Sequence, residues 1–257
     1  RDFAALRSEL GLPPASMTDH FDDAVLVEAR AVSRRPPVAT TDRTDIAFVT
    51  VDPPGAMDLD QAVHLERRDD GFRVHYAIAD LGSAIPPDGA VDAEARRRGQ
   101  TMYLPDGRVP LHPPVLSEGS LSLLPGQVRG VALWTVDVAA DGSLRSATVE
   151  RALVRSVARL EYATVQSDAD AGSPHPSIEP LADLGRLRRR VRLAAGAIDL
   201  ALPEQGVVRS GDAWTLRLEP RTEADTWNAE VSLLTGMAAA ELMLGAGIGL
   251  LRTLPEP

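Results

Sequence analysis

The chain has 257 residues and a formal net charge of −10, and 44% of its residues are hydrophobic and 25% charged, as in an ordinary globular protein. It contains no cysteine, which excludes disulfides, thiolate nucleophiles and cysteine-ligated zinc. The negative charge argues against a basic surface for nucleic acid over the whole chain, although bound cations and a local arginine groove can reverse the sign at one site.

No run of about 18 apolar residues is present, so no membrane span is expected. The segment that begins at Arg1 has no apolar core of a signal peptide, and a cytoplasmic location is the default expectation. All 27 basic residues are arginine, whose planar guanidinium suits phosphate and carboxylate partners.

Helices are expected in residues 1–40, and β-branched or alternating apolar segments predict strands beyond them. The predicted strands are Ile46–Val51, Ala62–Leu65, Phe72–Ala79, Val131–Ala139, Leu144–Val154 and Ala213–Leu218, with a hairpin turn at Asp141–Gly142. The predicted helices are Asp92–Arg98, Leu181–Leu202 and Glu223–Leu244, and residues 167–178 are expected to form an exposed loop. Strands followed by helices favour the α+β class, with a mixed or antiparallel sheet core flanked by helices.

The most informative segment carries three carboxylates within nine residues, Asp52, Asp58 and Asp60. Asp58 and Asp60 are two apart and point to the same side of an extended segment, and the Pro-Pro-Gly turn can fold Asp52 back toward them. Such a cluster repels itself unless a cation holds it, and oxygen ligands suit Mg²⁺. The alternative is a solvated acidic turn. An EF-hand is excluded because prolines occupy the loop and its glycine and terminal glutamate are misplaced.

This segment resembles the aspartate signature of the ribonuclease II / ribonuclease R family catalytic (RNB) domain, and the resemblance extends over roughly Arg43–Pro257. Further blocks follow in order: Tyr76–Asp80, Gly99–Asp106 with Val109–Leu111, Leu116–Gly119, Ser122–Gly126, Arg155–Val165 and Ala229–Leu244. The expected organisation is a helical extension over 1–40 and an RNB-like catalytic domain over 41–257 that is incomplete at its C-terminus.

The resemblance implies a metal-dependent exoribonuclease that degrades single-stranded RNA from its 3′ end to nucleoside 5′-monophosphates. Asp52, Asp58 and Asp60 match the family's catalytic aspartates, which hold Mg²⁺, with Mn²⁺ as an alternative ion. Tyr103 matches a tyrosine that stacks on the terminal nucleotide, a contact that tolerates every base. The competing interpretation of Tyr103 is a core aromatic.

Tyr162 and Glu230 match positions that favour RNA over DNA, where a hydrogen bond to the 2′-hydroxyl would be made. Helix-surface packing and an N-terminal helix charge are the alternatives for these two residues. The arginines of 186–192 are interpreted as a solvated helix face rather than as phosphate contacts.

Three departures from the family bear on activity. Gln61 stands where a fourth aspartate is expected; its neutral carbonyl oxygen can still bind a metal, with a weaker affinity. The arginine pair of a later family segment, and cold-shock or S1 domains, are not found in the chain.

Three hypotheses therefore stand: an exoribonuclease, a catalytically weak RNA-binding protein on the same fold, and a metal-binding scaffold unrelated to RNA. The third is disfavoured by the ordered blocks and by five histidines without zinc-type spacing.

Overall fold

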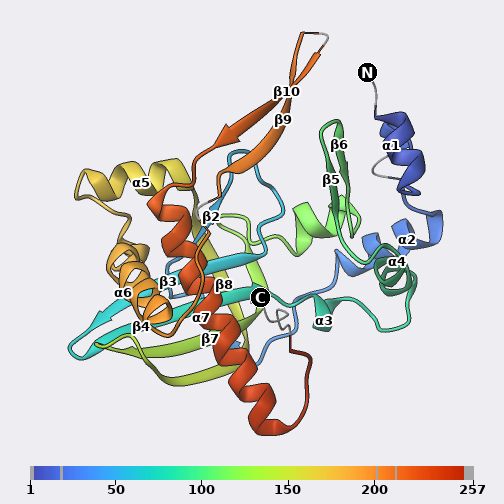
Figure 1. The fold of residues 1–257 in the computed structure, drawn as a ribbon. Coiled ribbons are helices and arrows are strands. Elements are labelled where there is room, and N and C mark those ends of the chain that lie inside the picture. The colour runs from blue at the N-terminus through green and yellow to red at the C-terminus, as the bar shows by residue number, and fades with distance from the viewer. Residues whose placement is uncertain (1–2, 18–19, 201, 212, 252–257) are drawn as a thin grey trace.

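The computed structural model describes residues 3–17, 20–200, 202–211 and 213–251. Its centre is a six-stranded mixed sheet with the order β1-β8-β2-β3-β4-β7 (Figure 1). The strands are β1 (Thr41–Asp42), β2 (Phe48–Asp52), β3 (Gln61–Arg68), β4 (Gly71–Ala79), β7 (Val128–Ala139) and β8 (Leu144–Glu161). The predicted α+β fold with a mixed sheet and flanking helices is confirmed.

The long strand β8 closes the sheet on itself, because it pairs with both ends of the strand order. Residues 144–155 of β8 pair antiparallel with β7, whereas residues 156–161 pair in parallel with β2. Of the remaining neighbours, β1–β8 is parallel, and β2–β3, β3–β4 and β4–β7 are antiparallel. As a result β2 and β3 lie side by side with the end of β2 next to the start of β3.

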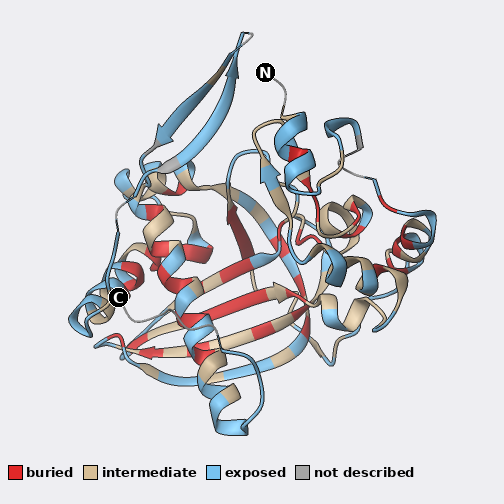
Figure 2. Ribbon diagram, turned by 45° about the vertical axis from the view of Figure 1, so that its right-hand side comes forward, coloured by how far each residue is buried: buried red, intermediate tan, exposed pale blue. Residues whose placement is uncertain are grey.

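Three helices cover one face of the sheet: α5 (Tyr162–Asp170), α6 (Leu181–Ala194) and α7 (Glu223–Ala246) (Figures 1 and 2). The main hydrophobic cluster fills the space between them and the alternate residues of β2, β3, β4 and β7, as the period of two in a strand requires. A capping box between Thr222 and Asp225 starts α7, and Gly247, in the left-handed conformation with φ 64°, ends it.

The N-terminal helices pack on a different side of the molecule. They are α1 (Ala4–Glu9), a short 3₁₀ turn η1 (Ala15–Met17) and α2 (Asp23–Val32), and α3 (Leu81–Ala84), α4 (Ala90–Arg98) and the π-turn η2 (Leu116–Ser120) lie near them. α2 shares a hydrophobic cluster with α4 and η2, to which Phe21, Val25, Val91 and Leu116 belong. The predicted boundary at residue 40 stays a prediction, but the segments on its two sides are packed together.

Two hairpins complete the fold. β5 (Met102–Leu104) and β6 (Gly107–Val109) form a short one. β9 (Glu204–Ser210) and β10 (Ala213–Glu219) form a longer one that projects from the body (Figure 1). Neither β5–β6 nor β9 was predicted, because such short hairpins carry little apolar periodicity.

Three predicted boundaries are wrong, and one of them is the end of the strand predicted over Leu144–Val154, which continues as β8 to Glu161. The segment 167–178 is not wholly a loop, because α5 continues to Asp170 and a 3₁₀ turn η3 occupies Pro176–Ile178. α5 is retained because Val165 and Ala169, one turn apart, face the main cluster. The predicted helix Leu181–Leu202 ends at Ala194, two residues before Gly196, whose φ of +90° is incompatible with a right-handed helix.

α7 has the length and apolar composition of a membrane span, the one such helix among the described residues. The core helix of a globular protein has the same properties. Residues along one side of α7, from Ala224 to Ala238, are buried, and the helix contacts α5, α6, β7 and β8. Its apolar character is thus explained, over this stretch, by packing on the sheet.

Candidate active site

The three predicted aspartates are delivered by the adjoining ends of β2 and β3. Asp52 is the last residue of β2, and the turn after it closes with a hydrogen bond from the Ala56 amide to the Pro53 carbonyl of 3.2 Å. Gly55 takes a φ of +79° in this turn, a conformation that favours glycine. The chain then returns through Asp58 and Asp60 to the start of β3.

Leu59 anchors the returning loop. Its side chain is fully buried, its amide donates to Ser122 Oγ at 3.1 Å, and its carbonyl accepts from the Leu123 amide at 2.7 Å. Because side chains alternate along an extended segment, burial of the Leu59 side chain turns those of Asp58 and Asp60 toward the opposite, outward face.

Two adjoining pockets receive these carboxylates, and Asp60 lines both. The smaller, of about 80 Å³, is also lined by Asp52, Gln61, Tyr162 and Asn228. The larger, of about 280 Å³, contains Asp58, Tyr103, Arg108 and His112 in its wall. The structure therefore brings most of the predicted site residues together around Asp60.

Burial and neighbouring like charges disfavour the ionised forms of Asp52 and Asp60. Burial raises the pKa of Asp52, and the neighbouring Asp60 and Asp58 add to the effect. Loss of hydration likewise raises the pKa of Asp60, although its side chain reaches solvent, and Asp58 contributes again. Oδ2 of Asp52 is buried without a hydrogen-bond partner. Burial, like-charge neighbours and an unpartnered carboxylate oxygen are conditions under which a bound cation would stabilise these carboxylates.

These donors fit a hard divalent cation, which prefers carboxylate oxygens and keeps several waters. Within the described residues no three histidine, aspartate or glutamate side chains are grouped so that they could hold one metal ion, so Asp52, Asp58 and Asp60 do not form a metal site in this arrangement. The metal itself stays a prediction.

Gln61 is engaged with a neighbour. Its Oε1 accepts a hydrogen bond from the Tyr76 hydroxyl. Burial raises the pKa of Tyr76 to about 12, so that hydroxyl remains a neutral donor. One lone pair of Oε1 is therefore used within the protein, and only the other is available to a metal or its water.

Tyr103 stands out from the surface on β5, with 72% of the residue exposed. The core-aromatic interpretation is excluded by this exposure, and a role in stacking on a nucleotide stays a prediction. Tyr162 lies at the start of α5, half-buried, and its hydroxyl accepts from Asn228 Nδ2 at 3.2 Å. Both tyrosines thus line pockets that contain Asp60.

Glu230 is placed elsewhere. It is 4% exposed on α7 and accepts from Nε and Nη2 of Arg192 on α6 at 2.9 and 2.7 Å. It does not line either pocket, because it faces α6 whereas Asn228 faces the site. The predicted contact of Glu230 with substrate remains a prediction, without geometric support from this arrangement.

Residues 186–192 are only partly a solvated face. Arg188 is buried and donates to the Gly142 carbonyl. The Arg186 guanidinium stacks over the Trp227 ring at 4.8 Å, and Arg189 pairs with Asp199 at 2.9 Å. These arginines bind parts of the fold to one another, and none of them lines either pocket.

Three residues of the site were not predicted: Arg108, His112 and Asn228. Arg108, on β6, contacts Asp58 Oδ2 at 3.4 Å and pairs with Glu118. It is the one arginine between Arg98 and Arg129 in the sequence, a signal that could have marked it. No pattern in the sequence distinguishes Asn228.

Known proteins are similar to this chain in sequence and in fold. The sequence model of the RNB domain family matches residues 40–257. Ribonuclease R of Vibrio parahaemolyticus is 30% identical over 217 residues, which is 80% of this chain and 26% of that protein. The chain thus spans about a quarter of the length of this curated relative.

Among solved structures, Mycoplasma genitalium RNase R in complex with ribose-methylated single-stranded RNA matches with a TM-score of 0.86 and 26% identity, over 93% of this chain and 39% of that one. Yeast Ssd1, a pseudonuclease, matches with a TM-score of 0.52 and 19% identity, over 65% of this chain and 20% of that one; this likeness shows the fold alone. With a match that covers residues 40–257, the chain belongs to the RNB domain family.

Proposed function

We propose that the protein is a Mg²⁺-dependent exoribonuclease that hydrolyses single-stranded RNA from its 3′ end and releases nucleoside 5′-monophosphates. The observation that carries the proposal is the convergence of Asp52, Asp58 and Asp60 on pockets beside the exposed Tyr103, in a chain whose relatives are ribonucleases. Mn²⁺ is the alternative ion.

Each side chain of the site would have a separate role in this reaction. Asp52, Asp58 and Asp60 would hold the metal, which when bound activates water and offsets charge on the phosphoryl group. Tyr103 would stack on the terminal base, a contact worth about 1–3 kcal/mol. Arg108, already beside Asp58, holds that carboxylate in place and offers positive charge to a phosphate. The Tyr162 hydroxyl, oriented by Asn228, is the donor or acceptor available to a 2′-hydroxyl.

Digestion of a 5′-labelled single-stranded RNA with Mg²⁺ tests the proposal, using the full chain beside Asp60→Asn. We expect a ladder that shortens from the 3′ end in the wild type and a rate at least about 10²-fold lower in the variant. Internal cleavage, or a ladder that persists unchanged in Asp60→Asn, would contradict the proposal. Omission of Mg²⁺ with a chelator should abolish the ladder as well.

A second candidate function is RNA binding with weak or no hydrolysis. The observation that favours it is the hydrogen bond that Tyr76 donates to Gln61, since it engages a neutral oxygen at the position of an expected carboxylate. Gln61→Asp distinguishes the two. For an active enzyme, the added charge should lower the Mg²⁺ concentration needed for half-maximal rate, on the order of tenfold. If the wild type binds RNA without cleaving it and Gln61→Asp cleaves it, the second candidate is correct.

A further inference from the structure

Arg7 on α1 is buried outside both pockets of the candidate active site, with 1% of the residue exposed. Its guanidinium is fully engaged: Nε and Nη2 donate to the two oxygens of Asp106 at 3.0 and 2.7 Å, and Nη1 donates to the Pro13 carbonyl at 3.1 Å. A bidentate ion pair with a carboxylate stabilises a buried arginine. Removal of one partner leaves the other charge buried and unpaired, which destabilises the fold.

Asp106 lies in the turn of the β5–β6 hairpin, 99 residues from Arg7. Each strand of this hairpin has three residues, and a two-stranded hairpin of this size is marginal without external support. The base is held by a hydrogen bond from the Leu111 amide to Thr101 Oγ1 of 3.1 Å. The tip is held by Arg7.

The hairpin carries two residues of the larger pocket. Tyr103 and Arg108 are directly opposite each other in its register, and both line the pocket with Asp58 and Asp60. A displacement of the tip would therefore move the exposed ring and the guanidinium relative to the carboxylates.

The N-terminal end of α1 makes a second contact, with the β9–β10 hairpin. The ring of Phe3, one turn before Arg7, packs edge-on against Trp214 of β10 with ring centroids 5.0 Å apart. The amide of Arg7 donates to the Phe3 carbonyl at 2.8 Å, so the two anchors belong to one helical turn. α1 is thereby fixed between the β5–β6 and β9–β10 hairpins, although it lies outside the segment matched by the family model.

We propose that Arg7 is a positioning residue for the candidate active site, which acts through Asp106 to hold Tyr103 and Arg108 at the pocket of Asp58 and Asp60. The inference rests on the proposed function for its consequence in catalysis, and on the Arg7–Asp106 contact for its structural part. A helix outside the family segment thus determines how the terminal nucleotide is held.

The test compares Arg7→Gln with the wild-type full chain, on RNA whose 3′-terminal base is 2-aminopurine. We expect KM to rise about tenfold, the equivalent of one lost base stack, with loss of the fluorescence quenching that stacking on Tyr103 produces. Tyr103→Ala should show the same loss of quenching, and the double variant should raise KM by less than the product of the two separate effects, because Arg7 acts in part through that ring.

The matched control is Arg145→Gln, which breaks an exposed ion pair with Asp70 on a distant hairpin and should leave KM and quenching unchanged. A role in stability alone would lower the active fraction, and hence kcat, without moving KM or the quenching, and would overturn the proposal. Should Arg7→Gln fold poorly, Arg7→Lys and Asp106→Asn retain more of the local packing and should show the same KM shift in smaller degree.

Hydrogen exchange separates this inference from the proposed function. Amides of residues 102–109 should exchange faster in Arg7→Gln than in Arg145→Gln, with or without RNA. If the wild type neither binds nor cleaves RNA, the proposed function fails. Hydrogen exchange still tests whether the Arg7–Asp106 contact holds the β5–β6 hairpin. Unchanged exchange in the hairpin would overturn the positioning role whatever the activity.

Discussion

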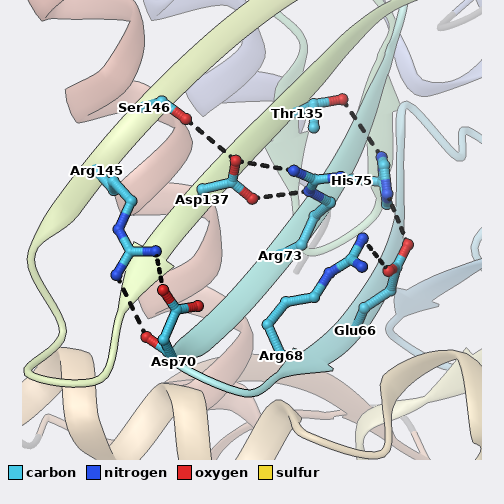
Figure 3. Close-up of polar contacts among 9 residues, drawn as sticks. All are labelled: Glu66, Arg68, Asp70, Arg73, His75, Thr135, Asp137, Arg145 and Ser146. Carbon is cyan, nitrogen blue, oxygen red and sulfur yellow. Dashed lines mark hydrogen bonds and ion pairs between the residues drawn. The ribbon is translucent and has the colours of Figure 1, made fainter.

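Two clusters of carboxylates lie in the same sheet, one where β2 ends and β3 begins and the other around β3, β4 and β7, and their partners differ. At the start of β3, Asp52 and Asp60 have raised pKa values, and Oδ2 of Asp52 has no partner. Further along β3 and β4, each acid of a second cluster is paired with a cation or a histidine (Figure 3).

The paired cluster is built by cross-strand neighbours. Asp137 accepts from Nε and Nη2 of Arg73 at 2.7 and 2.9 Å and from Ser146 Oγ at 3.1 Å. His75 lies between Glu66, at 2.9 Å, and Thr135, at 3.3 Å (Figure 3).

The hydrogen bonds from Arg73, together with its charge, lower the pKa of Asp137. An acid whose pKa is lowered by paired charge serves the fold, whereas one whose pKa is raised by burial and by like charges is a candidate for chemistry. The two clusters therefore teach that the partners of an acidic group, more than the number of acids, separate a structural cluster from a functional one.

The largest difference in RNA hydrolysis is expected when one aspartate in each cluster is replaced by asparagine. Asp52→Asn removes a carboxylate from the candidate metal site, and we expect RNA hydrolysis to fall at least about 10²-fold. Asp137→Asn weakens a partly exposed ion pair worth about 1 kcal/mol or less, and activity per folded molecule should stay within about twofold. Steady-state rates on one RNA measure both, and equal losses would break the comparison.

The pH dependence of stability should differ in sign between the clusters. Because the pKa of Asp52 is raised in the folded state, its contribution to stability is present below the unfolded pKa and is lost as pH rises through the folded pKa. Asp137, whose pKa is lowered, contributes above its unfolded pKa and loses that contribution as pH falls through the folded pKa.

Thermal unfolding with a chelator present measures this difference. Asp52→Asn should therefore unfold at a higher temperature than the wild type near pH 7, by at most about 2–4 °C, the shift that about 1 kcal/mol produces in a chain of this size. Asp137→Asn should unfold at a lower temperature at the same pH. Added Mg²⁺ should stabilise the wild type and Asp137→Asn more than Asp52→Asn.

The smallest effect is expected at Thr135. Its hydroxyl, His75 and Glu66 are arranged in a chain that resembles a nucleophile, base and carboxylate, but His75 is 8% exposed and neither pocket of the candidate active site includes any of the three. Thr135→Val should change RNA hydrolysis by less than about twofold and cost about 1 kcal/mol for one hydrogen bond. A large loss of activity with an unchanged unfolding temperature would make the second cluster functional.

Much of the fold could be predicted because local periodicity encodes it. The predicted strand Phe72–Ala79 and the predicted helix Glu223–Leu244 lie within β4 and α7. Both could be predicted because the apolar pattern of a strand or helix depends on residues that are close in the sequence. The end of the helix predicted from Leu181 could not be predicted in this way, because the backbone conformation of Gly196 ends α6.

The sequence by itself determined the aspartates, their spacing and the resemblance to the RNB family, whereas the exposure of Tyr103 came from the structure. Only the tertiary structure decided that Glu230 pairs with Arg192, that Arg108 joins Asp58, and that Arg7 holds Asp106. The physical reason is that a pattern of residues along the chain reports local geometry. Charge pairing, which decides whether an acid is free to bind a cation, depends on residues that folding brings from tens of positions away.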